Sequence, residues 1–405
     1  MSTIDSSIDA EARIDALCDE LLSRCDPKAA PASEFLGHQF DLGLAWVNFP
    51  EGHGGLGLSP KLQTRINRRL EAADAPSAWL RNPIGYGMGA PTIVTHGSDV
   101  QKRRYLRPLF TGEEIWCQLF SEPGAGSDVA GLSTRAVRDG DEWVVNGQKV
   151  WTSLAHRARW GMLVARTDPD QPKHKGLTYF VVDMHQPGVE ARPLRQMTGD
   201  AEFNEVYFTN ARVPDIERMG EVGEGWRVSL TTLMNERVAI GGTVPPKGSG
   251  PIRYAVRAWQ RQAHGSEESP AVAAQRDELM RLWVQAEVLR LTNIRASEMR
   301  KTGTPGPEGS IGKLASADLN KEITSFTMNL MGAEGMLYET GYRGGQLGSG
   351  MDFANPPKAF LRCRANSIEG GTTEVMKNIL GERVLGLPGD VRTDKDLPWI
   401  DVPRN

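Results

Sequence analysis

The sequence predicts a multi-domain α+β protein in which helices, then strands, then helices follow one another along the chain. Three observations carry this prediction. The 405 residues are enough for more than one hydrophobic core. Between residues 116 and 220, short runs of β-branched and aromatic residues alternate with turn residues, as in strands. On both sides of that segment, apolar residues recur at helical spacing. We therefore expect domains at residues 1–115, 116–220 and 221–405.

Each segment is supported by its own pattern. In the first, one helix face is marked by Ile8, Ile14, Leu17 and Leu21. In the second, the expected strands include residues 143–145, 162–164, 178–182 and 206–208. In the third, apolar residues from Leu279 to Leu289 predict a long helix that ends before the Gly- and Pro-rich residues 302–307. A further helix is expected at about residues 311–330.

The composition argues against several classes of protein. The net charge is −4, from 47 basic and 51 acidic residues, so nothing indicates a nucleic-acid-binding surface. The first residues are polar and acidic, unlike a targeting peptide, and no apolar run is long enough to cross a bilayer. The four cysteines have neither metal-ligand spacing nor a disulfide framework. We expect a cytoplasmic protein with no metal, no nucleic-acid partner and no membrane insertion.

Residues 118–153 are the most informative stretch. It combines glycines that let a ligand approach the backbone, short hydroxyls and a broad aromatic face. These residues are Gly124, Gly126, Gly131, Ser121, Ser127, Ser153 and Trp151. Composition alone would favour a Gly-rich surface loop followed by a hairpin turn at Asn146-Gly147. The order and spacing of the whole stretch favour a binding site instead.

The stretch closely resembles the flavin-binding signature of the acyl-CoA dehydrogenase family. The matching residues are Ser121, Glu122-Pro123, Ala125-Gly126-Ser127-Asp128, Gly147, Lys149, Trp151 and Ser153. A second family signature appears as Gly371-Thr372-Thr373-Glu374 and Arg383 to Pro388. The resemblance covers about residues 42–388. It implies an N-terminal helical domain, a central β-barrel-like domain, a C-terminal four-helix bundle, FAD as cofactor and an acyl-CoA as substrate.

The resemblance also implies roles for individual residues. Ser121 and Ser153 match positions whose hydroxyls hold flavin N5 and the neighbouring carbonyl, and Trp151 matches the residue that packs on the flavin. The cofactor-binding residues it implies are Gln118, Phe120, Ser121, Gly126, Ser127, Trp151, Ser153, Thr372 and Glu374. Ser127 also matches a position that contacts the pantetheine arm of the substrate. Arg237 matches an arginine that contacts CoA, with a surface ion pair as the alternative.

The reaction needs a carboxylate that removes the α-proton of the thioester while the β-hydride moves to flavin N5. In many family members this Glu precedes the Gly-Thr of the second signature, where this chain has Gly370. A minority branch places the base in a Leu-x-x-Glu-Arg pattern, which here contains Glu236. We therefore predict Glu236 as the base, on a small-residue helix face with Ser229 and Thr232 that could line a pocket. Glu369 lies one residue too early.

The backbone N–H of Gly370 keeps a catalytic role in this prediction. In the family, this amide and a ribityl hydroxyl of the flavin bind the thioester carbonyl. A donor aimed at the developing enolate oxygen is typically worth about 3 kcal/mol of barrier.

Two family elements that hold the adenine end of FAD from a neighbouring subunit are degraded. One survives as Arg261 to Gly265, including His264, and the other as Asn329 to Gly335, including Gly332. A Gly-rich insert lies at residues 341–350. Such erosion resembles actinobacterial heterotetramers with a non-catalytic sister chain, and a homotetramer with altered adenosine contacts is equally consistent.

Several functions remain open at this point. The first is a dehydrogenase that passes electrons to an electron-transfer flavoprotein, and the second is an acyl-CoA oxidase that uses O2. The net charge argues against DNA-associated relatives, and Glu236 argues against a non-catalytic partner subunit. Gly241 and Gly242, beyond the base, could leave room for a bulky acyl group such as a steroid side chain, or could serve close helix packing.

Overall fold

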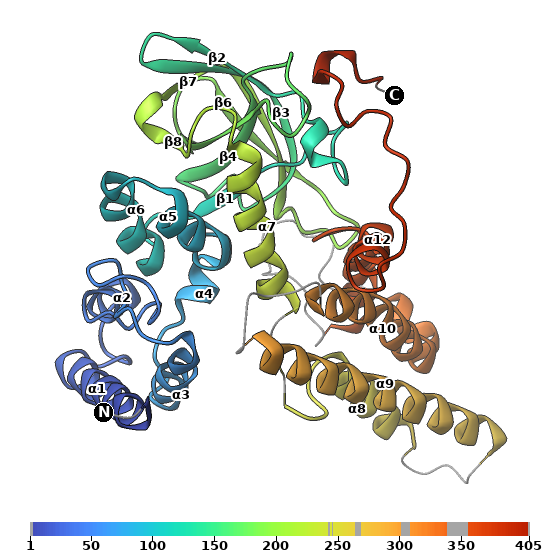
Figure 1. The fold of residues 1–405 in the computed structure, drawn as a ribbon. Helices are drawn as coiled ribbons and strands as arrows, with labels where there is room; N and C mark the ends of the chain where they lie inside the picture. The colour runs from blue at the N-terminus through green and yellow to red at the C-terminus, as the bar shows by residue number, and fades with distance from the viewer. Residues whose placement is uncertain are drawn as a thin grey trace. The chain divides into compact units, whose positions relative to one another are not determined.

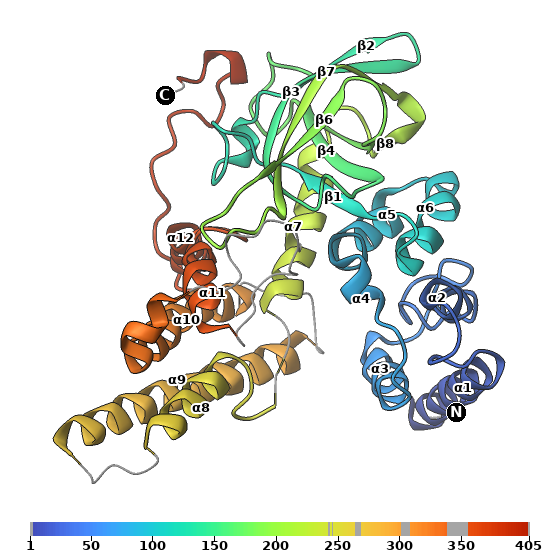
Figure 2. The same ribbon diagram turned by 180° about the vertical axis from the view of Figure 1, so that it is seen from behind.

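The computed structural model describes residues 3–241, 244, 246–263, 269–300, 308–337 and 355–403 (Figures 1 and 2). It contains two compact units. Unit 1 comprises Met1–Arg192, Asn204–Asn235 and Asp394–Asn405, and unit 2 comprises Pro193–Phe203 and Glu236–Thr393. Helices, then strands, then helices follow one another, so the predicted fold class is confirmed. The predicted boundaries at residues 1–115, 116–220 and 221–405 stay a prediction.

The first part of unit 1 is helical. Its α-helices are α1 (Thr3–Arg24), α2 (Ala32–Asp41), α3 (Gln63–Ala72), α4 (Ala78–Arg81), α5 (Ala90–His96) and α6 (Asp99–Thr111). The boundaries of α6 follow from local chemistry: Ser98 and Gln101 form a capping box at its start, and Gly112 ends it with φ 72°. Ile14 and Leu21, two of the residues predicted to mark one helix face, are fully buried in α1.

The central part of unit 1 is a mixed sheet. Its strands are β1 (Trp116–Leu119), β2 (Arg135–Asp139), β3 (Glu142–Ser153), β4 (Trp160–Arg166), β5 (Leu177–Asp183), β6 (Val189–Leu194), β7 (Phe203–Pro214) and β8 (Arg218–Met219). The order is β6-β7-β3-β2-β4-β5-β8, with β1 parallel to β4. Every residue of β4 is buried, so β4 forms the centre of the core. Tyr105 of α6 packs edge to face there on Trp116 of β1 and on Trp160 of β4.

The hairpin turn that composition alone favoured at Asn146-Gly147 is wrong. β3 runs without interruption from Glu142 to Ser153, and the turn between β2 and β3 lies at Gly140, with φ 64°. Gly147 is instead a point of close approach within the sheet. A Cβ atom on it would lie 2.4 Å from Thr134 Oγ1, so only glycine fits at this position without a steric clash.

The α-helices that lie wholly in unit 2 are α8 (Pro251–Ala263), α9 (Pro270–Arg300), α10 (Glu308–Met331), α11 (Pro356–Arg362) and α12 (Thr373–Arg383). Three of them, α8, α9 and α10, share a separate core. Leu279 and Leu282 of α9 pack with Ile323 and Phe326 of α10 in this core. The long helix predicted before residues 302–307 is therefore observed, as α9, and the helix predicted at about 311–330 is α10.

α7 (Gly225–Gly241) begins in unit 1, where hydroxyl groups anchor it. Thr232 Oγ1 lies 2.9 Å from Thr92 Oγ1 and 3.1 Å from the Tyr179 hydroxyl, and all three residues are fully buried. His96 Nε2 lies 2.8 Å from Thr231 Oγ1. The sequence suggested a pocket wall at Ser229 and Thr232, but this part of the face is filled by packing against α5 and β5.

Within the described residues, no helix combines the length and the apolar character needed to cross a membrane.

We predict that Thr92→Val destabilises the protein by about 1–3 kcal/mol, because Val keeps the shape but leaves Thr232 with one partner fewer in a buried position. Thr95→Val, on the exposed side of the same helix, is the matched control and is expected to change stability by less than about 0.5 kcal/mol. Urea unfolding followed by circular dichroism compares the two. Equal stabilities of the two variants would contradict the anchoring role of this network.

Candidate active site

A buried ion pair organises the stretch that the sequence singled out. Lys149 Nζ of β3 lies 2.8 Å from Glu122 Oε1, and the side chains are 0% and 5% exposed. The Glu122 carboxylate also accepts hydrogen bonds from the backbone N–H groups of Ser133 and Thr134, at 2.6 and 2.9 Å. Lys149 donates a second hydrogen bond to the carbonyl oxygen of Phe120. The pair therefore ties the segment before the loop, the segment after it and β3 to one another.

The surroundings hold Glu122 in its charged form. Burial by itself raises the pKa of this carboxyl group, but the Lys149 ammonium and the hydrogen bonds from Thr134 and Ser133 outweigh that effect and lower its pKa to about 2. Glu122 is thus an anion at any physiological pH. It is a structural residue, and the sequence reasoning assigned it no role beyond a place in the signature.

Trp151 lies two residues beyond this anchor, in an unusual conformation. Its backbone has φ 59°, in the left-handed region that few non-glycine residues adopt, and its side chain is 61% exposed. A large aromatic residue in this state is a recognised mark of a functional site. Trp151 is therefore not part of the hydrophobic core.

The other predicted flavin residues of unit 1 lie on the same two segments. Val150 donates its backbone N–H to the carbonyl oxygen of Ser121 at 2.9 Å, which places Ser121 beside β3. Ser121 and Ser153 are both half-buried. Gln118 lies in β1 and pairs with Met162 of β4. The structure thus brings Gln118, Ser121, Trp151 and Ser153 onto adjacent segments of one sheet.

Phe120 and the loop after Glu122 differ in exposure. The Phe120 ring is buried in the core and packs edge to face on Tyr179, so any contact with the cofactor would come from its backbone. Gly126 and Ser127 are exposed on the loop. A Cβ atom built on Gly124 or Gly126 would meet no atom within 4 Å, so the protein around the loop leaves space beside its backbone.

The second signature forms a group of its own in unit 2. Gly370 and Gly371 have φ 64° and 93°, a conformation that disfavours the Glu found at position 370 in many relatives. Thr372 caps α12 by accepting a hydrogen bond from the Val375 N–H at 3.2 Å. Glu374 is exposed in the first turn of α12. The N-terminus of a helix with free N–H groups favours an anion such as a diphosphate.

Glu369 is engaged by its neighbours. Its carboxylate accepts two hydrogen bonds from the Arg362 guanidinium, at 3.0 and 2.9 Å, and a third from Asn366 Nδ2 at 2.8 Å. A bidentate contact with arginine fixes the orientation of a carboxylate and occupies both of its oxygen atoms. The geometry is consistent with the prediction that Glu369 serves another purpose than catalysis.

Glu236 lies on α7, one turn after the buried Thr232, and its side chain is half-buried. The side chain of Arg237, the predicted contact for CoA, lies outside the described residues, as does Gly242. The roles of Glu236 and Arg237 stay predictions.

The degraded adenosine motifs are only partly described. Arg261 is exposed near the end of α8, whereas His264, Gly265 and the insert at residues 341–350 lie outside the described residues. Asn329 is exposed in α10, and Gly332 follows with φ 55°. The structure therefore leaves the predicted loss of adenosine contacts untested.

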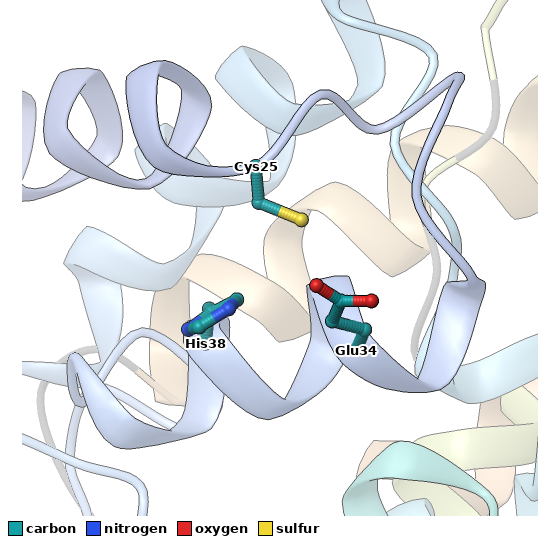
Figure 3. A group of neighbouring side chains, drawn as sticks. All are labelled: Cys25, Glu34 and His38. Carbon is teal, nitrogen blue, oxygen red and sulfur yellow. The ribbon is translucent and has the colours of Figure 1, made fainter.

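One group of side chains has the chemistry of a metal site. Cys25, Glu34 and His38 place their donor atoms within 4.8 Å of one another, with Glu34 and His38 one turn apart on α2 (Figure 3). Sequence analysis missed the Glu-x-x-x-His spacing. A tetrahedral zinc site needs four ligands, and this group supplies three. Burial raises the pKa of the Cys25 thiol, which opposes the thiolate form that binds metal. We assign this group no role.

Some buried hydroxyl groups near the two signatures have no hydrogen-bond partner. Thr152 Oγ1, next to Trp151, and Thr373 Oγ1, in the first turn of α12, are buried and unpartnered among the residues that the structure describes, and so is Thr134 Oγ1.

Comparisons with known proteins agree with this geometry. The "Acyl-CoA dehydrogenase, N-terminal domain" model matches residues 14–113, the "middle domain" model residues 117–211 and the "C-terminal domain" model residues 223–385. Acyl-CoA dehydrogenase FadE34 of Mycobacterium tuberculosis is 41% identical over 350 residues, which is 86% of this chain and 45% of FadE34, so the chain spans less than half of that relative.

A second relative matches over most of both chains. Acyl-CoA dehydrogenase IpdE1 of Mycobacterium tuberculosis is 37% identical over 350 residues, which is 86% of each protein. Among solved structures, the Tcur3481–Tcur3483 steroid ACAD is similar, with a TM-score of 0.72 and 26% identity, covering 94% of this chain and 98% of the other.

We predict that Glu122→Gln destabilises the protein by about 3–5 kcal/mol at neutral pH, because Lys149 would remain buried without its counterion. Glu142→Gln, an exposed carboxylate on the same strand as Lys149, is the control and should change stability little. Urea unfolding of both variants measures the difference. A loss for Glu122→Gln no larger than for Glu142→Gln would contradict the anchoring role of the pair.

The same ion pair predicts an acid dependence. Because the pKa of Glu122 falls from 4.5 to about 2 on folding, its contribution of about 3 kcal/mol is fully present above pH 4.5 and is lost as the pH falls toward 2. Wild type should therefore lose more stability than Glu122→Gln between pH 4.5 and pH 2. Parallel stability curves for the two proteins would show that Glu122 is not held in its charged form.

Proposed function

The chain belongs to the acyl-CoA dehydrogenase family, and from this premise we propose that it is an FAD-dependent dehydrogenase that converts an acyl-CoA to the trans-2-enoyl-CoA. The observation that carries the proposal is Trp151, an exposed indole in a left-handed conformation two residues from the Glu122–Lys149 anchor. Ser121 and Ser153 offer hydroxyls beside it, and Gly124 and Gly126 leave space by the loop. These residues fit a flat, hydrogen-bonding cofactor.

FAD is the cofactor, and when bound it supplies the acceptor for the hydride that leaves the β-carbon of the substrate. The residues that we propose would hold it come from both units of the chain. In unit 1 they are Gln118, Phe120, Ser121, Gly126, Ser127, Trp151 and Ser153. In unit 2 they are Thr372, which caps α12, and Glu374 in the first turn of that helix. The helix N-terminus suits the diphosphate part.

Glu236 removes the α-proton in this proposal. Two observations support it over Glu369: Arg362 and Asn366 occupy the carboxylate of Glu369, and the backbone at Gly370 has the left-handed conformation that favours glycine. Glu236 lies on α7, one turn after Thr232. The Gly370 N–H is the proposed donor to the thioester carbonyl, where negative charge grows as the proton leaves.

The electron acceptor that we propose is an electron-transfer flavoprotein, as the family resemblance implies, with O2 as the alternative. For the substrate, we propose a bulky acyl-CoA of the steroid side-chain type. Its support is the similarity to the Tcur3481–Tcur3483 steroid ACAD. Ser127 and Arg237 are the proposed contacts for the CoA part.

We expect wild type, purified with FAD, to lose its flavin absorbance near 450 nm when titrated anaerobically with a steroid side-chain acyl-CoA. Glu236→Gln should slow this reduction at least about 100-fold because the base is removed. Glu369→Gln is the discriminating variant and should reduce at near the wild-type rate. Fast reduction of Glu236→Gln together with slow reduction of Glu369→Gln would reverse the assignment.

Two additions complete the experiment. A panel of straight-chain and branched acyl-CoAs determines whether the bulky class is preferred. Admitting O2 or an electron-transfer flavoprotein to the reduced enzyme distinguishes an oxidase from a dehydrogenase by the rate of flavin reoxidation. Absence of bleaching with every acyl-CoA would contradict the proposed reaction.

We also propose that the chain forms a tetramer, either of one chain or with a sister chain. α9 carries an exposed apolar stripe whose members follow one another at intervals of about one helical turn. They are Met280, Val284, Val288 and Leu291, with exposed fractions of 47, 58, 56 and 52%. An exposed apolar helix face of this kind is typical of a subunit interface. The name of the steroid ACAD, which pairs Tcur3481 with Tcur3483, adds support for the sister-chain form.

We predict that the double variant Val284→Glu, Val288→Glu sediments as a smaller species than wild type, because two charges would be buried in the interface. Gln285→Glu, exposed on the same helix, adds a charge beside the stripe and is the control. Analytical ultracentrifugation measures the masses, alone and with a candidate sister chain. An unchanged mass for the double variant would contradict this interface.

A further inference from the structure

The last residues of the chain form part of unit 1. Residues 382–393 are all exposed, and residues 386–393 have no helix or strand. The chain then packs against unit 1 again. Trp399 is only 9% exposed and lies in a 3₁₀ turn at Trp399–Asp401 (Figure 1). Residues 386–405 lie beyond the family models, the last of which ends at residue 385. The family match therefore gives this segment no role.

The segment is bonded to the loop between β4 and β5. Trp399 donates its backbone N–H to the carbonyl oxygen of Gln171 at 2.9 Å, and Ile400 donates to that of Pro169 at 3.1 Å. Pro398 forms a β-bridge with Pro172. The indole N–H of Trp399 points elsewhere, to the carbonyl oxygen of Gly131 at 3.1 Å. One side chain thus links the end of the chain to the loop that follows Ser127.

The Trp399 ring also covers a buried cation. The Arg166 guanidinium lies 4.4 Å from the centre of the ring, and Arg166 is 2% exposed. Arg166 donates hydrogen bonds to the carbonyl oxygens of Ala130, at 2.6 Å, and Leu132, at 3.3 Å. A cation–π contact is strongest when the cation is shielded from water, as here. Arg166 therefore holds the end of the loop, and Trp399 shields Arg166.

A shared lysine forms a second link. Lys173 Nζ lies 2.7 Å from Asp394 Oδ2 of the C-terminal segment and 2.9 Å from Asp128 Oδ2 of the loop, and its side chain is 13% exposed. Asp128 follows Ser127 directly. Asp128 and Asp394 bind the same ammonium group from different parts of the chain. Lys173 therefore links the loop to the C-terminal segment.

We infer that residues 394–402, the C-terminal clamp, hold residues 124–132, the binding loop, in the conformation that presents Ser127 to the ligand. Trp399 and Lys173 are positioning residues in this role. The inference rests on the proposed function for what Ser127 contacts. It explains why a Gly-rich loop can be pre-formed: the clamp removes conformational freedom that a ligand would otherwise have to remove on binding.

The test uses the full FAD-loaded protein and the variants Trp399→Ala and Trp399→Phe, with Ile400→Ala as the matched control. Ile400 is the next residue, 56% exposed, and its bond to Pro169 comes from the backbone. A chain that ends at Thr393 removes the clamp entirely. Hydrogen exchange measured by mass spectrometry reports on residues 126–134, and binding of free coenzyme A reports on the ligand.

We expect exchange in residues 126–134 to become at least about tenfold faster in Trp399→Ala and in the shortened chain, with α1 unchanged. Trp399→Phe, which keeps the ring but not the indole N–H, should fall between wild type and Trp399→Ala. Coenzyme A should bind about tenfold more weakly to Trp399→Ala. In turnover, KM should rise while kcat stays near wild type, because Trp399 acts on the ligand through the binding loop and not on the proposed base.

Unchanged exchange in Trp399→Ala and in the shortened chain would overturn the inference, and so would equal effects of Ile400→Ala. Faster exchange with unchanged binding of coenzyme A would also overturn it, since the loop would then not serve the ligand. If wild type shows no flavin reduction with any acyl-CoA, the proposed function fails, whereas the exchange measurement still reports on the clamp.

Discussion

The candidate site depends on the buried ion pair between Glu122 and Lys149. Removing two charges from water costs several kcal/mol per ion, and their attraction offsets this cost only when the remaining hydrogen-bonding groups are satisfied. Here Ser133, Thr134 and the carbonyl oxygen of Phe120 satisfy them. Because the pair and these partners come from three segments, the pair fixes how the segments are placed. That fixed frame allows Trp151 to keep an uncommon backbone conformation.

Strand alternation shows how far the sequence determines this part of the site. Period two from Trp143 places Val145 and Lys149 on the inner face of β3, and all three are buried. The same period would bury Trp151, but its φ of 59° breaks the alternation and leaves the indole 61% exposed. The order of helices and strands was predictable from periodicity and the role of Trp151 from the resemblance. The partner of Lys149 lies 27 residues away, which no local pattern indicates.

At the second signature, the backbone conformation of residue 370 suits the glycine that the sequence has there. A glycine at position 370 was interpreted as a lost carboxylate, and the structure shows φ 64° there, which a side chain disfavours. The adjacent carboxylate of Glu369 is held by Arg362 and Asn366. Sequence reasoning could not foresee Arg362 as its partner, because that pairing depends on how α11 meets the segment before α12. Glu236 therefore stays the predicted base, because the carboxylate of Glu369 is engaged by other side chains.

The binding loop is held at both ends and open in the middle. At its start, Glu122 is fixed by Lys149, and at its end Arg166 holds the carbonyl oxygens of Ala130 and Leu132 under the ring of Trp399. Between these points, the backbone at Gly124 and Gly126 has open space beside it. Such a loop can meet a ligand without first losing conformational entropy, since the ends are already ordered. The Glu122–Lys149 pair lies inside the family signature, whereas Trp399 lies beyond the last residue that the family models match. A loop that belongs to the family signature is thus held in part by a residue outside the family match.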